Sequence, residues 1–222
     1  MSDIIQTHGN YQELESYQNS VVIFDATNDF CIWYLQKGDR TIDQMIQAAR
    51  SGKQNIIEGC AASGISSETE IKLIGVARAS LEELLEDYRD YLRIHHLSLW
   101  EKDDSRIVQI RQIAKQKNKT YETYKTYFSP DDAELFCNTA ISLIHQTNYL
   151  LDRQLQSLAD SFTEKGGLRE RMYNARIQYR ETQKEKVLSL MREIYLDAAQ
   201  YQNESLLKKI EEAANLLKGG KK

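Results

Sequence analysis

Residues 67–95 read SETEIKLIGVARASLEELLEDYRDYLRIH, and this stretch decides the fold class. Ser67 and Glu70 match a capping box, in which the serine hydroxyl accepts from the backbone N–H of Glu70 and the carboxylate reaches back. Apolar side chains then recur at alternating steps of three and four residues, as in the seam of a helix packed in a bundle. The seam residues are Ile74, Ala77, Leu81, Leu84, Tyr88 and Tyr91. We therefore predict a helix that begins at residue 67 and ends near His95-His96.

Two further helices are expected before this one. The first runs from about residue 11 to residue 36, with apolar side chains at steps of four and three that line one face. Gly38 suits the left-handed backbone that commonly ends a helix. The second starts near Thr41 and ends in the small-residue stretch 59–66. Both helices can therefore join the third in one bundle.

Another long helix is expected after a basic insertion. Residues 96–130 form this insertion, and residues 105–127 within it are expected to be one helix. The sequence Ser-Pro-Asp-Asp at residues 129–132 offers an N-cap serine, a proline at the first helical position and acids near the positive helix end. We predict that a fourth long helix begins there and ends near Phe162.

The sequence thus predicts an all-α protein, with an antiparallel up-and-down four-helix bundle over residues 11–164 and a helical C-terminal extension over residues 165–218. The extension is expected to hold a helix over about 168–201 and a last short helix. A single proline, ten glycines and many good helix formers agree with this class. Residues 1–10 are expected to be a flexible leader, and residues 219–222 a flexible tail.

Charge and cysteine usage limit the function classes. The net charge is −4, which argues against a general polyanion-binding protein. Residues 1–10 lack the basic start and apolar core of a secretory signal, and no apolar run reaches the length of about 18 residues that a membrane span needs. Cys31, Cys60 and Cys137 lie far apart in apolar helical contexts. We interpret them as buried free thiols and expect a cytoplasmic protein.

Three short patterns invite a catalytic or metal-binding interpretation, and none meets its requirements. Residues 51–54, Ser-Gly-Lys-Gln, lack the first glycine and the Ser or Thr of a phosphate-binding loop. His95 and His96 are neighbours that point about 100° apart on a helix, so they do not converge on one ion. Cys137 and His145 lie two helical turns apart, about 11 Å, which is too far for a nucleophile–base pair. We expect no cofactor, no metal site and no enzyme activity.

The stretch QMIQAARSGKQNIIEG, residues 44–59, resembles the characteristic segment of four-helix-bundle proteins encoded in intervening sequences of bacterial 23S rRNA genes. That segment has Gln, basic and Ala residues, Ser, and then Asn-Ile-x-Glu-Gly. Residues from about 138, with LIHQTNYLLDRQL and then GGLRERM, resemble a longer subfamily with a C-terminal four helix bundle suffix domain. The matching positions are Gln44, Ala48, Ala49, Ser51, Asn55, Ile56, Glu58 and Gly59, with Glu70 in the next helix.

The resemblance implies an antiparallel four-helix bundle that assembles into a ring-shaped homo-oligomer, often a pentamer. One branch of the family, the accessory proteins of diversity-generating retroelements, works with a reverse transcriptase and binds nucleic acid. Asn55, Glu58 and Gly59, the distinctive residues of the segment, have two interpretations. They either shape and cap the end of a helix, or they form a polar site at a subunit junction.

Two basic segments are candidates for nucleic-acid binding. Residues 105–127 carry six basic and one acidic side chains, and residues 165–192 carry eight and three, so each has a balance of +5. Lysines neutralise phosphates and tyrosines stack on bases, but a solvated face beside packing tyrosines explains the first segment as well. Pairing of arginines with bundle acids such as Glu82, Glu83, Glu86 and Asp87 explains the second. The candidate residues are Lys115, Lys117, Lys119 and Lys125, beside Tyr121, Tyr124 and Tyr127, and Arg169, Arg176 and Arg180.

Two functions from different classes fit these observations. The first is a non-enzymatic assembly module, a homo-oligomeric helical-bundle scaffold or adaptor, which rests on the long seams and the resemblance. The second is a nucleic-acid-binding accessory protein of the retroelement type that uses the basic segments. A salt-sensitive affinity for RNA or DNA separates the two, because phosphate contacts release counterions.

Overall fold

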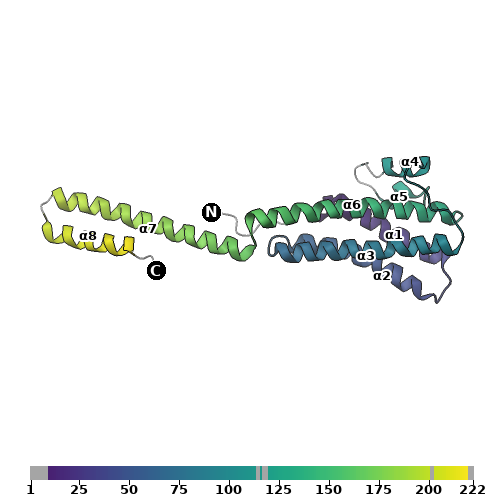
Figure 1. Cartoon of the computed structure of the whole chain (residues 1–222), viewed down its shortest axis with the longest axis horizontal. Coiled ribbons are helices and arrows are strands. Elements are labelled where there is room, and N and C mark those ends of the chain that lie inside the picture. Colours follow the sequence, from purple (N-terminus) through teal and green to yellow (C-terminus); the bar gives the residue numbers. More distant parts are fainter. Residues whose placement is uncertain (1–9, 114–115, 117–119, 201–202, 220–222) are drawn as a thin grey trace. The chain divides into compact units, whose positions relative to one another are not determined.

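A computed structural model of the chain describes residues 10–113, 116, 120–200 and 203–219, and across these residues the fold is all-α, as predicted (Figure 1). The expected leader, apart from Asn10, and the end of the expected tail at 220–222 lie outside the described residues. None of the described helices is long and apolar enough to cross a membrane. The helical elements are η1 (Tyr11–Glu13), α1 (Glu15–Tyr34), α2 (Arg40–Ala62), α3 (Ser67–Ile94), α4 (Ser105–Ile113), α5 (Tyr121–Tyr124), α6 (Ala133–Lys165), α7 (Leu168–Gln200) and α8 (Glu204–Gly219).

Four long helices, α1, α2, α3 and α6, form a bundle in which each helix packs against two of the others (Figure 1). The contacts show the direction of neighbouring helices. Gly52 of α2 faces Leu81 of α3, and Gly59, further along α2, faces Ile74, which comes earlier in α3. These two helices therefore run in opposite directions.

Aromatic side chains fill the core at one end of the bundle. The Phe30 ring lies 4.9 Å from the rings of Tyr88 and Tyr91 and 5.4 Å from that of Phe136. Tyr88 is fully buried, and its hydroxyl shares a hydrogen bond of 3.1 Å with the Thr27 hydroxyl. Edge-to-face rings contribute about 0.5–1.5 kcal/mol beyond the area they bury, so this cluster fixes how α1, α3 and α6 meet.

The start of α3 corrects the predicted capping box by one residue. Ser66 has an extended backbone and is the N-cap, and its hydroxyl accepts from the Thr69 N–H at 3.2 Å. Ser67 is the first helical residue, and Glu70 is buried with 8% of its surface exposed. Two adjacent serines offer the same chemistry, and the turn before α3 decides which one caps the helix.

The expected single helix over 105–127 is wrong. Two short helices, α4 and α5, occur instead, and residues 114–115 and 117–119 between them lie outside the described residues. Ile107 and Ile110 of α4 are buried, as are Tyr124 and Phe128. Packing of both short helices on the bundle has overridden the continuous helical periodicity of the segment.

The predicted start of the fourth long helix at residues 129–132 is also wrong. The Ser129 hydroxyl accepts from the Asp131 N–H at 3.2 Å, which closes a turn. The helix α6 begins at Ala133, and its N-cap is Asp132, whose carboxylate accepts from the Leu135 N–H at 2.9 Å. Asp132 caps the helix in place of Ser129 because its carboxylate accepts the capping hydrogen bond and also places a negative charge at the positive end of the helix.

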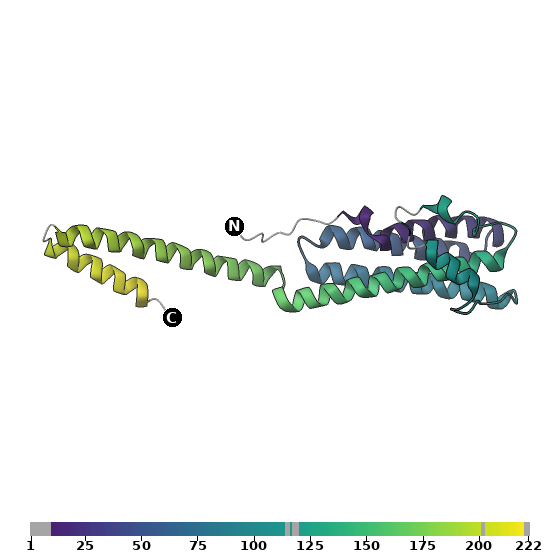
Figure 2. The same ribbon diagram turned by 90° about the horizontal axis from the view of Figure 1, so that it is seen from above.

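The residues from Arg169 onward form a second compact unit. Within it α8 folds back along the C-terminal half of α7, as the view in Figure 2 shows. Asn203 caps α8 by accepting from the Leu206 N–H at 3.2 Å, and the Tyr195 hydroxyl reaches Glu211 at 3.5 Å. Ala198 is the buried residue of α7. We name this helical pair the hairpin.

Candidate functional site

The residues of the family-like segment lie on α2, mostly against α3. A Cβ atom at Gly52 would lie 2.8 Å from Leu81, and one at Gly59 would lie 3.0 Å from Ile74. The Ser51 hydroxyl shares a hydrogen bond of 2.9 Å with the Ser80 hydroxyl of α3. Close helix packing thus accounts for the small residues of this segment.

Asn55 and Gly59 do not shape the end of a helix, so that prediction is wrong. The Asn55 amide donates to the Ser51 carbonyl at 2.9 Å, and α2 continues to Ala62. Glu58 is exposed and makes no ion pair with any residue that the structure describes. Gln44, on the same helix, lines a shallow pocket of about 610 Å³ together with Ser51, Ser80 and Glu83.

The first basic segment does not form the predicted stacking surface where it is described. Lys115, Lys117 and Lys119 lie outside the described residues. Lys125 pairs with Glu122 at 3.1 Å, and both side chains are exposed. Tyr124 is buried, and the Tyr121 hydroxyl donates to Asp29 of α1 at 2.5 Å. These two tyrosines therefore pack against the bundle, which was the alternative interpretation.

The second basic segment lies on α7. Arg169, Arg176 and Arg180 are exposed, and their spacing of seven and four residues places them on one face of the helix. No carboxylate of the described residues lies within 4.0 Å of these three guanidinium groups.

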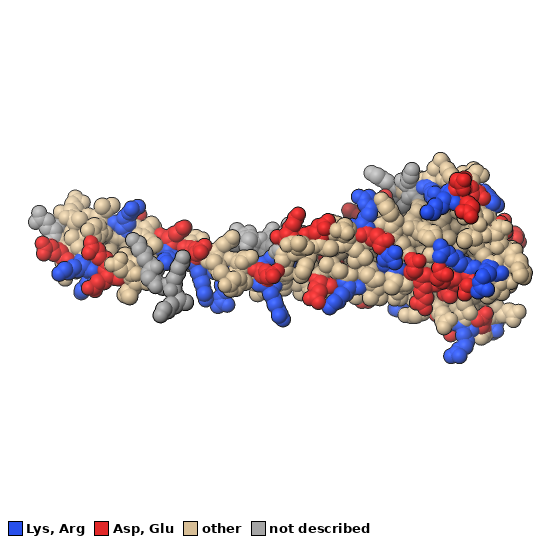
Figure 3. Space-filling view, in the orientation of Figure 1, with Lys and Arg blue, Asp and Glu red and all other residues tan. Residues whose placement is uncertain are grey.

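Two of the four bundle acids that were expected to pair with these arginines instead bind side chains of their own unit. Glu82 accepts from the Asn148 amide at 2.9 Å, and Glu86 pairs with Arg89 at 2.6 Å. Acidic and basic side chains are interspersed on the face of the bundle seen in Figure 3. That face therefore carries no single basic patch among the residues shown in colour.

A pocket that the sequence did not predict lies where the connector after α3 and the short helix α4 cover α6. Its volume is about 890 Å³. The polar residues that α6 contributes recur mostly at steps of three and four residues, so they lie on one face of the helix. This spacing is the pattern in the sequence that could have indicated the pocket. These residues are Asn138, Ser142, His145, Gln146 and Tyr149. We name this cavity the α4 pocket.

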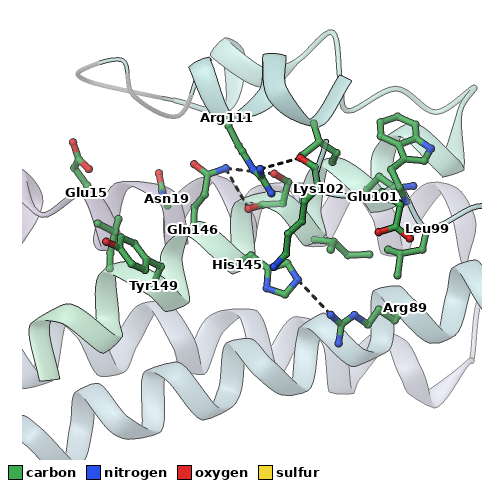
Figure 4. Close-up of a pocket in the computed structure, with 16 residues that line it drawn as sticks. Glu15, Asn19, Arg89, Leu99, Glu101, Lys102, Arg111, His145, Gln146 and Tyr149 are labelled. Carbon is green, nitrogen blue, oxygen red and sulfur yellow. Dashed lines mark hydrogen bonds between the residues drawn. The ribbon is translucent and has the colours of Figure 1, made fainter. Parts of the chain in front are cut away.

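Three cationic side chains from three elements line the α4 pocket, namely Arg89 of α3, Lys102 of the connector and Arg111 of α4 (Figure 4). Arg89 Nη2 lies 3.3 Å from His145 Nε2, and Arg111 donates to the Lys102 carbonyl at 3.0 Å. The lining also includes two carboxylates, Glu15 and Glu101. The connector and α4 thus bring together side chains that are distant in sequence.

Burial and the neighbouring cations together lower the pKa of His145. Burial lowers its pKa most, Arg89 lowers it next, and Lys102 and Arg111 lower it further against an opposing effect of Glu82. A guanidinium only donates hydrogen bonds, so Nε2 of the neutral imidazole accepts and its proton lies on Nδ1. Cys137, considered with His145 as a catalytic pair, is fully buried and does not line the pocket. The two residues therefore belong to different environments.

No protein-family model matches the chain, and no curated protein or solved structure matches it either. The resemblance of residues 44–59 thus stays a prediction. Among the described residues, no group of three or more His, Cys, Asp or Glu side chains could hold a metal ion. The three cysteines are buried, and none is joined in a disulfide, as predicted.

Proposed function

We propose that the protein is a non-enzymatic scaffold whose copies associate through the hairpin. One observation carries the proposal: α7 bears a row of exposed apolar side chains that α8 does not cover. We name this row the α7 stripe. Its members are Met172, Tyr179, Val187, Leu190 and Ile194, with exposed fractions of 53%, 65%, 43%, 57% and 41%.

The stripe has the geometry of a packing seam. Its members are separated by seven, eight, three and four residues, which places them within one narrow face of a helix. The less exposed residues Leu188, Met191 and Tyr195 lie on a neighbouring face of α7, together with buried Ala198. Arg176 and Gln183 fall on the same face between Met172 and Val187, so the apolar surface is densest from Val187 to Ile194. Exposed apolar surface of this kind commonly marks a protein–protein contact. A second helix pair can pack on the stripe without displacing α8.

The distribution of charge along the hairpin favours its association with the hairpin of a second copy that runs antiparallel to it. Residues 168–186 hold six basic and three acidic side chains, a balance of +3. Residues 193–212, which include the turn of the hairpin, hold two basic and five acidic side chains, a balance of −3. When the turn of one hairpin lies over residues 168–186 of another, these opposite charges face each other. This arrangement also sets the exposed arginines of α7 beside carboxylates.

Sedimentation velocity of the full chain tests this proposal directly. We expect wild-type protein to sediment as an assembly of at least two chains at micromolar concentration. Leu190→Glu places a carboxylate in the stripe, where it would be buried without a partner, and shifts the equilibrium to monomers by roughly tenfold or more in dissociation constant. Circular dichroism checks that the helix content is unchanged.

Ser189→Glu provides the matched control. Ser189 is exposed, adjacent in sequence, and points away from the stripe. The Ser189→Glu substitution adds the same charge as Leu190→Glu and is expected to leave the assembly intact. A wild-type monomer at all concentrations contradicts the proposal, and so does a pentamer, the ring that the resemblance implies, if Leu190→Glu leaves it unchanged.

Nucleic-acid binding is the second candidate function, favoured by the exposed face of Arg169, Arg176 and Arg180, near which the described part of the chain places no carboxylate within 4.0 Å. If this face binds RNA, affinity for mixed-sequence single-stranded RNA is micromolar at low salt and falls steeply as salt rises. Changing all three arginines to glutamine then abolishes the binding, whereas Lys125→Gln, at a lysine paired with Glu122, does not. Absence of binding at low salt excludes this function for α7.

A further inference from the structure

The α4 pocket has the size and lining of a small-molecule site. Its volume of about 890 Å³ falls in the range of roughly 300–1,000 Å³ that such sites occupy. Apolar side chains supply much of the wall, and polar side chains are gathered at a few points, which is the usual division in a ligand pocket. The apolar wall residues are Leu99, Ile107, Ile141 and Leu150.

The three cations face the pocket from three different elements. Arg89 and Lys102 both act on His145, whose charged form they disfavour, and Arg111 adds to this effect from α4. Figure 4 shows the Lys102 side chain extending from the connector toward the imidazole, while Arg89 holds the other side of the ring. Like charges gathered in this way repel one another. An anion among them would relieve that repulsion.

Several hydrogen-bonding groups at the pocket lack partners among the described residues. Arg89 Nε is buried and donates to no acceptor, and the Nδ1–H of His145 is not engaged by any described residue. Asn19, with 1% of its surface exposed, leaves its Oδ1 without a donor. Buried polar groups are nearly always satisfied. Arg89 Nε and Asn19 Oδ1 are covered by neighbouring atoms, so a ligand that bonds to them must displace part of that cover.

The two carboxylates of the lining do not balance its three cationic side chains, although one of them, Glu101, is next to Lys102 in the connector. Glu15 lies with Asn19 and Tyr149 at the end of the pocket that is remote from Arg89 in Figure 4. Glu86 occupies only Nη1 of Arg89. The pocket is therefore polarised, with cations at one end and an acceptor-rich, partly aromatic end opposite.

We propose that the α4 pocket binds a nucleoside monophosphate. The phosphate group lies among Arg89, Lys102 and Arg111, which donate charge-assisted hydrogen bonds. The base packs on the apolar wall toward Tyr149, and an exocyclic amino group donates to Asn19 Oδ1. This proposal rests on the bundle alone and is independent of assembly through the hairpin.

Isothermal titration calorimetry of the full chain tests the proposal, with adenosine 5′-monophosphate, adenosine and inorganic phosphate as separate ligands. We expect the monophosphate to bind with micromolar affinity and more tightly than either part. Lys102→Gln weakens binding by about tenfold, the loss of one charge-assisted contact. Asn19→Leu weakens binding of the monophosphate and leaves binding of inorganic phosphate unchanged.

Arg93→Gln is the matched control, because Arg93 lies one turn after Arg89 on α3, is exposed and pairs with Asp90 outside the pocket lining. Lys102 makes no side-chain hydrogen bond to a described residue, so its variant folds normally, and thermal unfolding verifies this. Equal weakening by Lys102→Gln and Arg93→Gln overturns the proposal. Undetectable binding of the monophosphate at millimolar concentration, or binding no tighter than that of inorganic phosphate, overturns it as well.

Discussion

At the residue scale, the tightest constraint on the bundle is the contact between Gly52 of α2 and Leu81 of α3. A Cβ at position 52 would lie 2.8 Å from two atoms of the Leu81 side chain. Gly52→Ala must therefore push Leu81 within a close-packed core, and we expect it to lower the free energy of unfolding by roughly 1–3 kcal/mol. Urea unfolding followed by circular dichroism measures this change.

Gly75 supplies the comparison, because it also lies in a helix but a Cβ there would meet no atom within 4 Å. Gly75→Ala is expected to raise the free energy of unfolding by about 0.5–1 kcal/mol, since alanine loses less conformational entropy in a helix. Equal effects of the two substitutions would show that α2 and α3 do not approach as closely as described.

Asp87 makes the fold sensitive to pH. Burial, with Glu83 and Asp90, raises its pKa to about 6, and its Oδ2 has no hydrogen-bond partner among the described residues. Because the pKa in the folded state exceeds that in the unfolded chain, the stability contributed by protonated Asp87 is present in full below about pH 4. It is lost as the pH rises through about 6.

Asp87→Asn removes this dependence. With allowance for solvent screening of a half-buried group, we expect it to raise the melting temperature by roughly 2–4 °C at pH 8 and by almost nothing at pH 4. Differential scanning calorimetry at the two pH values measures both. Asp103→Asn, at an exposed position of the connector, is the control and should have little effect at either pH. An equal gain in melting temperature at pH 4 and pH 8 would show that ionisation of Asp87 does not cause the pH dependence.

At the scale of the element, the corrected start of α3 gives a sharp prediction. The Ser66 hydroxyl accepts from the Thr69 N–H, whereas Ser67 is already helical. Ser66→Ala should lower the free energy of unfolding by about 1 kcal/mol, and Ser67→Ala should change it by no more than a few tenths. Chemical denaturation of both variants decides between the two serines, and a larger loss for Ser67→Ala would restore the sequence-based cap.

The helices also differ in how far the sequence could predict them. The four long helices follow from apolar periodicity, because a stripe such as Ile74 to Tyr91 of α3 is a local property of the chain. The break between α4 and α5 depends on how Ile110 and Tyr124 pack on the bundle, and no local pattern encodes that contact. The α4 pocket stayed hidden for the same reason, since Arg89, Lys102 and His145 meet only after folding.

At the scale of the whole molecule, we propose that two copies associate through the hairpin, with the turn of one hairpin over the first half of α7 in the other. In that arrangement residue 184 lies at the centre of the paired α7 helices. Equivalent residues near 184 then face each other across the pair, and those toward either end of α7 are far apart. Parallel association would instead bring all equivalent residues equally close.

Distances between spin labels in two copies test this claim most directly. Glu185→Cys and Asn174→Cys place single labels at exposed sites of α7 away from the stripe, and the three native cysteines are buried. We predict a short distance between copies for position 185. For position 174 we predict an offset of roughly 30 Å along the helices, because ten residues on each copy at 1.5 Å each separate it from the centre. Equal short distances at both positions, or no dipolar coupling between copies at either, would contradict the account.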